Sequence, residues 1–345
     1  MLFTPTTDFL TISELLGEAW GVGIGASIIQ YIAWSDHVGI FSALEKHSEL
    51  RRSDLLQYTS LSEAGIDALI PILQALTLVN EGPGGALELS SLAREYLLKS
   101  SPYYVGNGLF VRHTRELPPT YQQTPEKPYE RKAAWDVDLR LRIQHSRNFA
   151  ASVVAARGSE FQDIKRLVDV GGGSGVLAIP LAVDHPDMEI TILELPESLP
   201  HIQEFLSPYD LASRITVRAT DVIHDSWNVP ECDGVYFGNI FHSQNDQICR
   251  SLCDKSYRVL RPGGKIFVHE VLFTEAKDGP LLAALWNAVM LHQPEAGRQR
   301  TASELKAILE SAGFSECTLR PTASGYSLIS AMKTSSTASQ VGFPL

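Results

Sequence analysis

A short apolar run that leads directly into a cluster of glycines constrains the fold of this chain more than any other feature. The run is 167–170, and Gly171-Gly172-Gly173-Ser174-Gly175 follows it without a break, before apolar residues at helical spacing. A strand, a glycine loop and a helix in this order are typical of the place where an open parallel sheet binds a nucleotide. Glycine lets the backbone turn there and approach a ligand closely.

Further apolar runs with strand character follow along the C-terminal half. They alternate with segments whose apolar residues recur at helical spacing. The sequence therefore predicts an α/β fold, a doubly wound sheet of parallel strands that is covered by helices on both faces. We expect the later strands at 189–194, 215–218, 234–237, 265–270 and 326–331, and one late helix from 301 to near 313.

The first hundred residues have a helical pattern instead. Apolar residues recur every three or four positions over 66–76, and Ser60 and Glu63 precede them at the spacing of a capping box. The turn-forming segment 79–85 then leads into a short predicted hairpin. Helices followed by a hairpin indicate a winged-helix-like domain. Because Lys and Arg are scarce in it, the pattern favours dimerisation over DNA binding.

Changes in composition divide the chain into four parts. A proline-rich connector begins at Pro118, and a helix is expected over 133–157. After Lys333 the chain is rich in Ser and Thr, which is typical of a disordered tail. We therefore expect a helical dimerisation domain over 1–118, a linker and connecting helix over 119–157, an α/β domain over 158–333 and a disordered tail over 334–345.

Charge and cysteine content narrow the partners and the compartment. The formal net charge of −11 argues against binding to nucleic acid or to an anionic membrane surface, since both require basic patches. The N-terminus lacks the layout of a signal peptide, and the apolar stretch 19–34 is shorter than a membrane span. Four scattered cysteines are too few for a disulfide framework. These features predict a cytoplasmic protein with reduced thiols.

The details of the glycine loop distinguish between two nucleotide cofactors. Glu194 ends the strand that follows the loop, and a carboxylate there can accept hydrogen bonds from both ribose hydroxyls. The NAD fingerprint places its third glycine three residues after the second, whereas Gly173 and Gly175 are two apart. No pyrophosphate site is evident. This spacing favours S-adenosylmethionine over NAD.

A second acidic residue has two interpretations. Asp221 follows the strand expected at 215–218 and is placed to reach an adenine ring. The same residue type is also a common N-cap of a helix. The sequence leaves both interpretations open.

At this point the chain resembles a known family, the small-molecule O-methyltransferases that carry an N-terminal dimerisation domain and include caffeate and acetylserotonin methyltransferases. The resemblance rests on 38–44, 69–76 and 89–98 in the N-terminal half, and on 169–175, 193–196, 259–265 and 297–301 in the C-terminal half.

This resemblance implies a class I methyltransferase fold, Rossmann-like and doubly wound, with S-adenosylmethionine as cofactor. It also implies a homodimer in which N-terminal helices partly close the partner's pocket. The cofactor-binding residues that it implies are Asp169, Gly171, Gly173, Glu194, Leu195, Asp221 and Val222.

The resemblance also implies a catalytic base. His242 matches the family histidine that takes a proton from the substrate hydroxyl, and Glu270 matches a glutamate that orients this histidine. A phenol, with an unperturbed pKa of about 10, needs such a base at neutral pH. The chain departs from the family at two positions, because Ser243 replaces an aspartate and Gln299 replaces a second glutamate.

Three further residues are expected to bind the substrate. Met290 and His292 lie in a predicted helix that lines the substrate pocket in the family. If the substrate is a 2-oxo acid, Arg112 or Arg115 can clamp its carboxylate bidentately. An alternative interpretation places a metal ion on His242 and His292. Two ligands fall short of a typical first shell, so we expect no metal.

Three functions follow from these interpretations. The first is methyl transfer from S-adenosylmethionine to a hydroxyl of a small, aromatic secondary metabolite. The second is metal-assisted methylation of the β-carbon of a 2-oxo acid, which some members of the family carry out. The third is a protein that binds the cofactor without transferring its methyl group.

Overall fold

The computed structural model describes residues 28–47, 50–101, 104, 118–123, 137–291 and 297–334. Internal contacts divide the chain into two compact units. The first unit comprises Met1–Ala133, His242–Asn245 and Val271–Ala302, and the second comprises Ala134–Phe241, Asp246–Glu270 and Ser303–Leu345. Two segments from the C-terminal half therefore group with the N-terminal residues. The domain boundaries expected near 118 and 157 stay a prediction, and the expected tail lies almost entirely outside the described residues.

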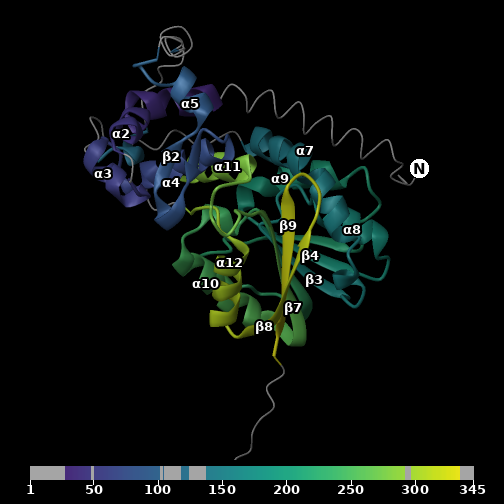
Figure 1. Cartoon of the computed structure of the whole chain (residues 1–345). Helices are drawn as coiled ribbons and strands as arrows, with labels where there is room; N and C mark the ends of the chain where they lie inside the picture. The colour runs from purple at the N-terminus through teal and green to yellow at the C-terminus, as the bar shows by residue number, and fades with distance from the viewer. Residues whose placement is uncertain are drawn as a thin grey trace, which may run out of the picture. The chain divides into compact units, whose positions relative to one another are not determined.

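The first unit consists of short helices and a hairpin (Figure 1). Strands β1 and β2 pair antiparallel, with Val79 opposite Leu89. The elements are α2 (Ile40–Lys46), α3 (Leu55–Tyr58), α4 (Glu63–Ala75), β1 (Val79–Glu81), β2 (Leu87–Leu89), α5 (Ser91–Tyr96) and α11 (Leu281–Leu291), with single 3₁₀ turns at η1 (Arg52–Asp54), η2 (Pro83–Gly85), η3 (Pro119–Tyr121) and η6 (Phe241–Ser243), the last of which begins in the second unit.

Helix α4 begins at Glu63, two residues later than an N-cap at Ser60 would start it. The hydroxyl of Ser62 accepts a hydrogen bond from the backbone N–H of Gly65 at 3.1 Å, so Ser62 is the N-cap and not the expected Ser60. The apolar residues of the helix are buried, as their spacing predicted, with Leu69 and Ile72 fully inaccessible. The helix is therefore held mainly by its packing in the first unit.

Helix α11 completes the first unit from late in the sequence. The amide of Asn287 donates a hydrogen bond to the carbonyl of Asp67 in α4 at 3.0 Å. The hydroxyl of Thr120 donates to the carbonyl of Leu291 at 2.7 Å, and the hydroxyl of Tyr121 donates to the carbonyl of Ala288. Residues more than 150 positions apart thus share one packed unit.

The second unit is built on a seven-stranded sheet of order β5-β4-β3-β6-β7-β9-β8. Strands β3 to β7 pair parallel, and β8 pairs antiparallel with β9. The strands are β3 (Arg166–Val170), β4 (Glu189–Glu194), β5 (Ile215–Ala219), β6 (Cys232–Gly238), β7 (Leu260–Val271), β8 (Phe314–Pro321) and β9 (Tyr326–Lys333). This sheet confirms the predicted doubly wound α/β fold.

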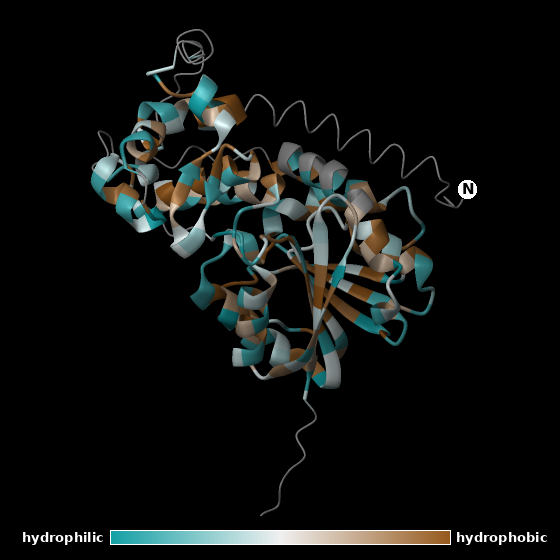
Figure 2. Ribbon diagram, viewed as in Figure 1, coloured by the Kyte–Doolittle hydropathy of each residue, from teal (hydrophilic) through white to brown (hydrophobic). Residues whose placement is uncertain are grey.

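Helices flank this sheet on both sides, with α7, α8 and α9 on one and α10 and α12 on the other (Figure 1). The central strands carry hydrophobic residues almost throughout, as Figure 2 shows, because both of their faces are covered. The helices are α7 (Val137–Ala156), α8 (Ala178–Asp184), α9 (Leu199–Leu206), α10 (Asp246–Val259) and α12 (Ala302–Ser311), with 3₁₀ turns at η4 (Ser159–Phe161) and η5 (Pro196–Ser198).

Strand β8 was not predicted from the sequence. It lies at the edge of the sheet, and its side chains are mostly half-buried or exposed. Such a strand carries polar residues and lacks the continuous apolar run by which the central strands are recognised.

Candidate functional site

The glycine loop joins β3 to α8 at the carboxyl end of the sheet. Gly171, Gly173 and Gly175 have φ values of +65°, +55° and +73°, which residues with a Cβ rarely adopt. A Cβ on Gly171 would also come within 2.5 Å of the Ile240 side chain, and one on Gly172 within 2.6 Å of the Asp169 carboxylate. The glycines are therefore required both by the backbone conformation and by the close approach of neighbouring side chains.

Glu194, at the end of β4, lies beside this loop. Its Oε2 accepts a hydrogen bond from the backbone N–H of Gly173 at 3.0 Å, and its Oε1 accepts one from Leu195 at 3.0 Å. The side chain is 8% exposed, so part of it remains accessible. The structure thus brings together the glycine loop, Glu194 and Leu195, all of which the sequence assigned to the cofactor.

Asp169 is the most unusual ionisable group of this region. It is buried at the end of β3, and its Oδ2 has no hydrogen-bond partner among the described residues. Burial, and then the neighbouring charge of Glu194, raise the pKa of this carboxyl to about 7. A buried carboxyl whose Oδ2 lacks a hydrogen-bond partner among the described residues, next to the glycine loop, is a group that a bound ligand can stabilise.

Asp221 and Val222 form a tight turn after β5. Asp221 Oδ1 accepts hydrogen bonds from the backbone N–H groups of Ile223 and His224, at 3.0 and 3.1 Å, and its Oδ2 lies 2.9 Å from Nδ1 of His224. The side-chain hydrogen bond with His224 lowers the pKa of this carboxyl. No helix follows Asp221 among the described elements, so its carboxylate closes a turn and does not cap a helix. Its role toward adenine stays a prediction.

Lys255 on α10 holds the same turn in place. Its ammonium group donates to the backbone carbonyls of Val222, Ile223 and Asp225 at 3.0, 2.7 and 2.8 Å. The indole N–H of Trp227 also donates to the Val222 carbonyl, at 3.1 Å. No local pattern indicated this role, because a lysine inside a helix is usually solvated and the acceptors of Lys255 are backbone atoms distant in sequence.

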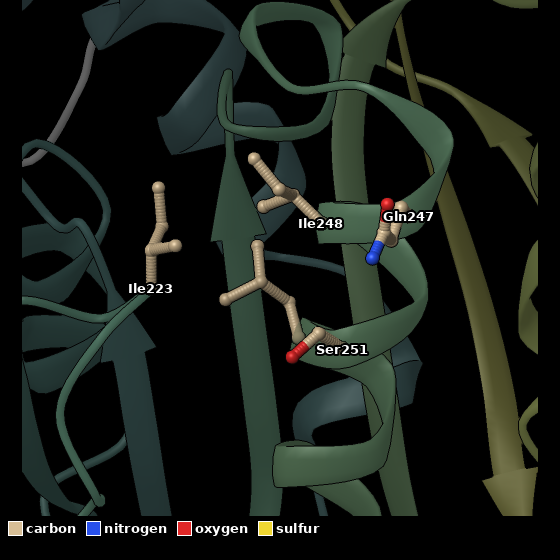
Figure 3. Close-up of a pocket in the computed structure, with 5 residues that line it drawn as sticks. Ile223, Gln247, Ile248 and Ser251 are labelled. Atoms are coloured by element: carbon tan, nitrogen blue, oxygen red, sulfur yellow. The ribbon is translucent and has the colours of Figure 1, made fainter.

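A pocket of about 170 Å³ lies between this turn and α10 (Figure 3). Ile223 borders it from the turn, while Gln247, Ile248, Ser251 and Leu252 border it from the helix. It adjoins the turn formed by Asp221 and Val222. None of the residues that line it was predicted as a site residue.

The predicted base belongs to the first unit. His242 is 5% exposed, and its ring meets that of Trp286 edge to face, with centroids 5.4 Å apart. The backbone at Gly297 approaches the backbone of His242 and Ser243 so closely that a Cβ there would clash. The position of His242 thus depends on two segments that are distant from it in sequence.

Gln299 and Met290 belong to the same unit. Gln299 is 2% exposed, its backbone N–H donates to Oδ1 of Asn287 at 3.1 Å, and its side-chain Oε1 has no hydrogen-bond partner among the residues that the structure describes. Met290 is half-buried on α11. The adjacent Arg300 is fully buried and donates to the carbonyl of Gln244 at 2.8 Å, which joins the segment after His242 to this part of the unit.

Glu270 belongs to the second unit, at the end of β7, where it is 1% exposed. Its neighbour His269 makes a separate set of contacts: its Nδ1 lies 2.7 Å from the hydroxyl of Tyr236, and its Nε2 lies 2.8 Å from that of Thr322. Burial lowers the pKa of His269 to about 3, so the ring is neutral. His269 is thus a structural residue, fully engaged within the sheet.

Two predicted residues, Arg112 and His292, lie outside the described residues, and so does any metal site that includes His292. Within the described ranges, no group of three or more His, Cys, Asp or Glu side chains is arranged to hold a metal ion. No helix in the same ranges is both long enough and apolar enough to cross a membrane.

Comparison with known proteins identifies the family of the chain. The O-methyltransferase domain family matches residues 132–315. The chain is 35% identical to acetylserotonin O-methyltransferase from Gallus gallus over 164 residues, which are 48% of this chain and 46% of that protein. It is 28% identical to the enzyme of the same name from Bos taurus over 334 residues, which are 90% of this chain and 95% of that one. With the chicken protein, the chain therefore aligns over about half of the relative's length.

The fold is shared with solved structures. An O-methyltransferase family 2 protein from Planctomyces limnophilus, in complex with apigenin, superposes with a TM-score of 0.74 at 24% identity, covering 96% of this chain and 98% of that one. Human N-acetylserotonin methyltransferase in complex with SAM superposes with a TM-score of 0.54 at 24% identity, covering 97% of this chain and all of that one (100%). The described sheet thus has the class I methyltransferase fold.

Proposed function

Because the chain belongs to the O-methyltransferase family, we propose that it transfers a methyl group from S-adenosylmethionine to a hydroxyl of a small aromatic secondary metabolite. The observation that carries the proposal is the contact between the Glu194 carboxylate and the backbone N–H of Gly173. A carboxylate can accept hydrogen bonds from ribose hydroxyls, and this one lies beside a loop in which four of the five residues are glycine, at the carboxyl ends of adjacent parallel strands. The related enzymes from Gallus gallus and Bos taurus are named for acetylserotonin, a small compound with a hydroxyl on an aromatic ring.

The described residues fit this cofactor, which supplies an electrophilic methyl group on a sulfonium. Glu194 retains acceptor capacity beyond its two backbone donors, since a carboxylate accepts about four hydrogen bonds. The glycine loop presents backbone and no side chains at Gly171 and Gly173. The buried Asp169 adds a group next to the loop whose ionised form a cationic ligand stabilises.

His242 is the general base in this proposal. It takes the proton from the substrate hydroxyl as the oxygen attacks, which raises the fraction of productive encounters at neutral pH. Edge-to-face packing against Trp286 restricts the imidazole ring. Glu270 orients the base, Gln299 takes the place of a second acid, and Arg112, Met290 and His292 contact the substrate.

The proposal is tested by a labelled-methyl assay of the purified chain against a panel of phenols and 2-oxo acids, with and without a chelator. We expect a phenol to be methylated with release of S-adenosylhomocysteine, unaffected by the chelator. His242→Ala then lowers kcat by roughly 10²- to 10⁴-fold, the usual contribution of a general base, while the Kd for S-adenosylmethionine stays within about twofold. His37→Ala, at an exposed histidine of the same unit, serves as the matched control.

The alternatives predict different results. Methylation of a 2-oxo acid that stops when the chelator is added supports the metal-assisted reaction. Cofactor binding with no S-adenosylhomocysteine produced from any substrate supports a protein that does not transfer the methyl group. Full turnover by His242→Ala refutes the assignment of the base while leaving the transferase activity intact.

We also propose that the protein is a cytoplasmic homodimer. None of the four cysteines, all of which lie in the described ranges, forms a disulfide, and three of them are buried, which is consistent with a reducing compartment. Light scattering after gel filtration tests the stoichiometry. A mass near 37.9 kDa, that of one chain, rejects the dimer.

A further inference from the structure

A histidine outside every sequence motif contacts the glycine loop. His145 lies on α7, and its Nδ1 is 2.8 Å from the hydroxyl oxygen of Ser174, within the loop. Ser174 is 2% exposed, so its hydroxyl has little access to water and depends on partners in the protein. This contact joins the loop to a helix that precedes β3 in the chain.

Two backbone N–H groups of the loop donate to acceptors on β4. The N–H of Gly171 donates to the Leu193 carbonyl at 2.8 Å, and the N–H of Gly173 donates to Glu194 at 3.0 Å. Helix α7 borders the opposite side, because a Cβ on Gly173 would lie 3.6 Å from the Leu141 side chain. The loop is therefore held between β4 and α7, and the bond to His145 fixes it on the α7 side.

The His145 ring is itself held in place. It stacks on Phe205 of α9, with centroids 4.8 Å apart and planes inclined by 26°. Asp138 of α7 pairs with His201 of α9 at 3.4 Å, a second link between the two helices. Burial lowers the pKa of His145, so the imidazole is neutral at pH 7 and has one donor and one acceptor nitrogen.

We infer that His145 is a positioning residue, which holds the glycine loop in its cofactor-binding conformation through the hydroxyl of Ser174. A loop fixed before binding does not have to be ordered when the cofactor arrives, so the affinity rises. The inference rests on the proposed binding of S-adenosylmethionine by this loop. Because His145 acts on the loop, its effect falls on cofactor affinity and not on kcat.

The test compares four variants of the full chain by calorimetric titration with S-adenosylmethionine. His145→Ala and Ser174→Ala each remove one partner of the bond, and the double variant removes both. His145→Asn is the rescue variant, because its amide occupies the place of the Nδ1 side of the ring. We expect each single alanine variant to raise the Kd by roughly three- to tenfold, as for the loss of one hydrogen bond. The Kd of the double variant should then be no higher than that of the weaker-binding single variant. The Kd of His145→Asn should lie within about twofold of that of the unmodified protein.

A matched control separates positioning from general stability. His185 shares a hydrogen bond of 3.2 Å with the carbonyl of Ala156, at the other end of α7 from the loop. His185→Ala should lower the melting temperature and leave the Kd unchanged. If His145→Ala does not fold, then Ser174→Ala and His145→Asn still decide the question.

Two results overturn the inference. One is a Kd within twofold of the unmodified protein for Ser174→Ala or for a folded His145→Ala. The other is a double variant whose fold-change is the product of the two single ones, which means that the residues act independently. If the unmodified chain does not bind S-adenosylmethionine at all, the proposed function fails instead, so the two failures are distinguishable.

Discussion

Oε2 of Glu194 lies 3.0 Å from the backbone nitrogen of Gly173 and accepts its hydrogen. The bond links the end of β4 to the loop that follows β3. One carboxylate therefore holds the conformation of the loop and lies at the proposed cofactor site.

Replacing this carboxylate should weaken cofactor binding. Glu194→Ala removes the acceptor for Gly173 and the acceptors for the ribose, so we expect the Kd for S-adenosylmethionine to rise by roughly ten- to hundredfold. Glu194→Gln retains one acceptor oxygen and should lose less. Titration calorimetry measures both, with Glu189→Gln at the exposed start of the same strand as the control. An unchanged Kd for Glu194→Ala contradicts the assignment of the site.

The buried carboxyl of Asp169 predicts a pH dependence of stability. Its pKa is raised from 3.8 to about 7, so the folded state holds a proton that the unfolded state releases above pH 4. The contribution of this carboxyl to the free energy of unfolding is therefore lost as the pH rises from about 4 to about 7. The loss amounts to roughly 4 kcal/mol at most, since one pKa unit corresponds to about 1.4 kcal/mol.

Asp169→Asn should abolish this dependence, because an amide does not titrate. Urea unfolding of the ligand-free protein at pH 5 and pH 7.5 measures it. From pH 5 to pH 7.5, the free energy of unfolding of the variant should rise relative to that of the unmodified protein. A constant difference between the two proteins would show that Asp169 is ionised throughout.

Gly171 should not tolerate a side chain. An alanine there meets two costs, the positive φ of +65° and the contact with Ile240. Gly263→Ala is the matched control, because its φ is +75° and nothing lies within 4 Å of its Cβ. We expect about 1–2 kcal/mol of destabilisation from the backbone in both variants, and about 1–3 kcal/mol more at Gly171 from the contact. Equal losses in urea unfolding would mean that the contact relaxes at no cost.

Lys255 should stabilise the turn at Asp221. Lys255→Met keeps most of the length of the side chain but leaves the carbonyls of Val222, Ile223 and Asp225 without this donor. We expect a loss of about 1–2 kcal/mol and a weaker affinity for S-adenosylmethionine. Lys306→Met, at an exposed ion pair with Glu310, should change stability by less than about 0.5 kcal/mol. Similar small effects at the two lysines would argue against a role for Lys255.

The sequence predicted those parts of the fold in which a single segment carries a recognisable pattern. The run 167–170 is apolar because β3 is buried on both faces, and the glycines follow because their φ values are positive. Glu194 was found for a similar reason, since it ends the neighbouring strand. Local pattern and final structure agree wherever one segment carries its own signal.

The rest depended on contacts between residues distant in sequence. His145 reaches Ser174 from another helix, and Lys255 binds backbone carbonyls thirty or more positions earlier, which no side-chain pattern records. Likewise, nothing local indicated that 271–302 groups with the N-terminal residues. Such placements follow from packing, and packing is a property of the whole unit.

The membership of α11 in the first unit has a consequence for synthesis on the ribosome. Helix α4 is made early, with Leu69 and Ile72 destined for burial, while its neighbour α11 emerges some two hundred residues later. At about 5–20 residues per second, this interval lasts roughly 10–40 seconds. During that time α11 is not yet available to pack against α4, so the first unit matures after most of the second has been translated.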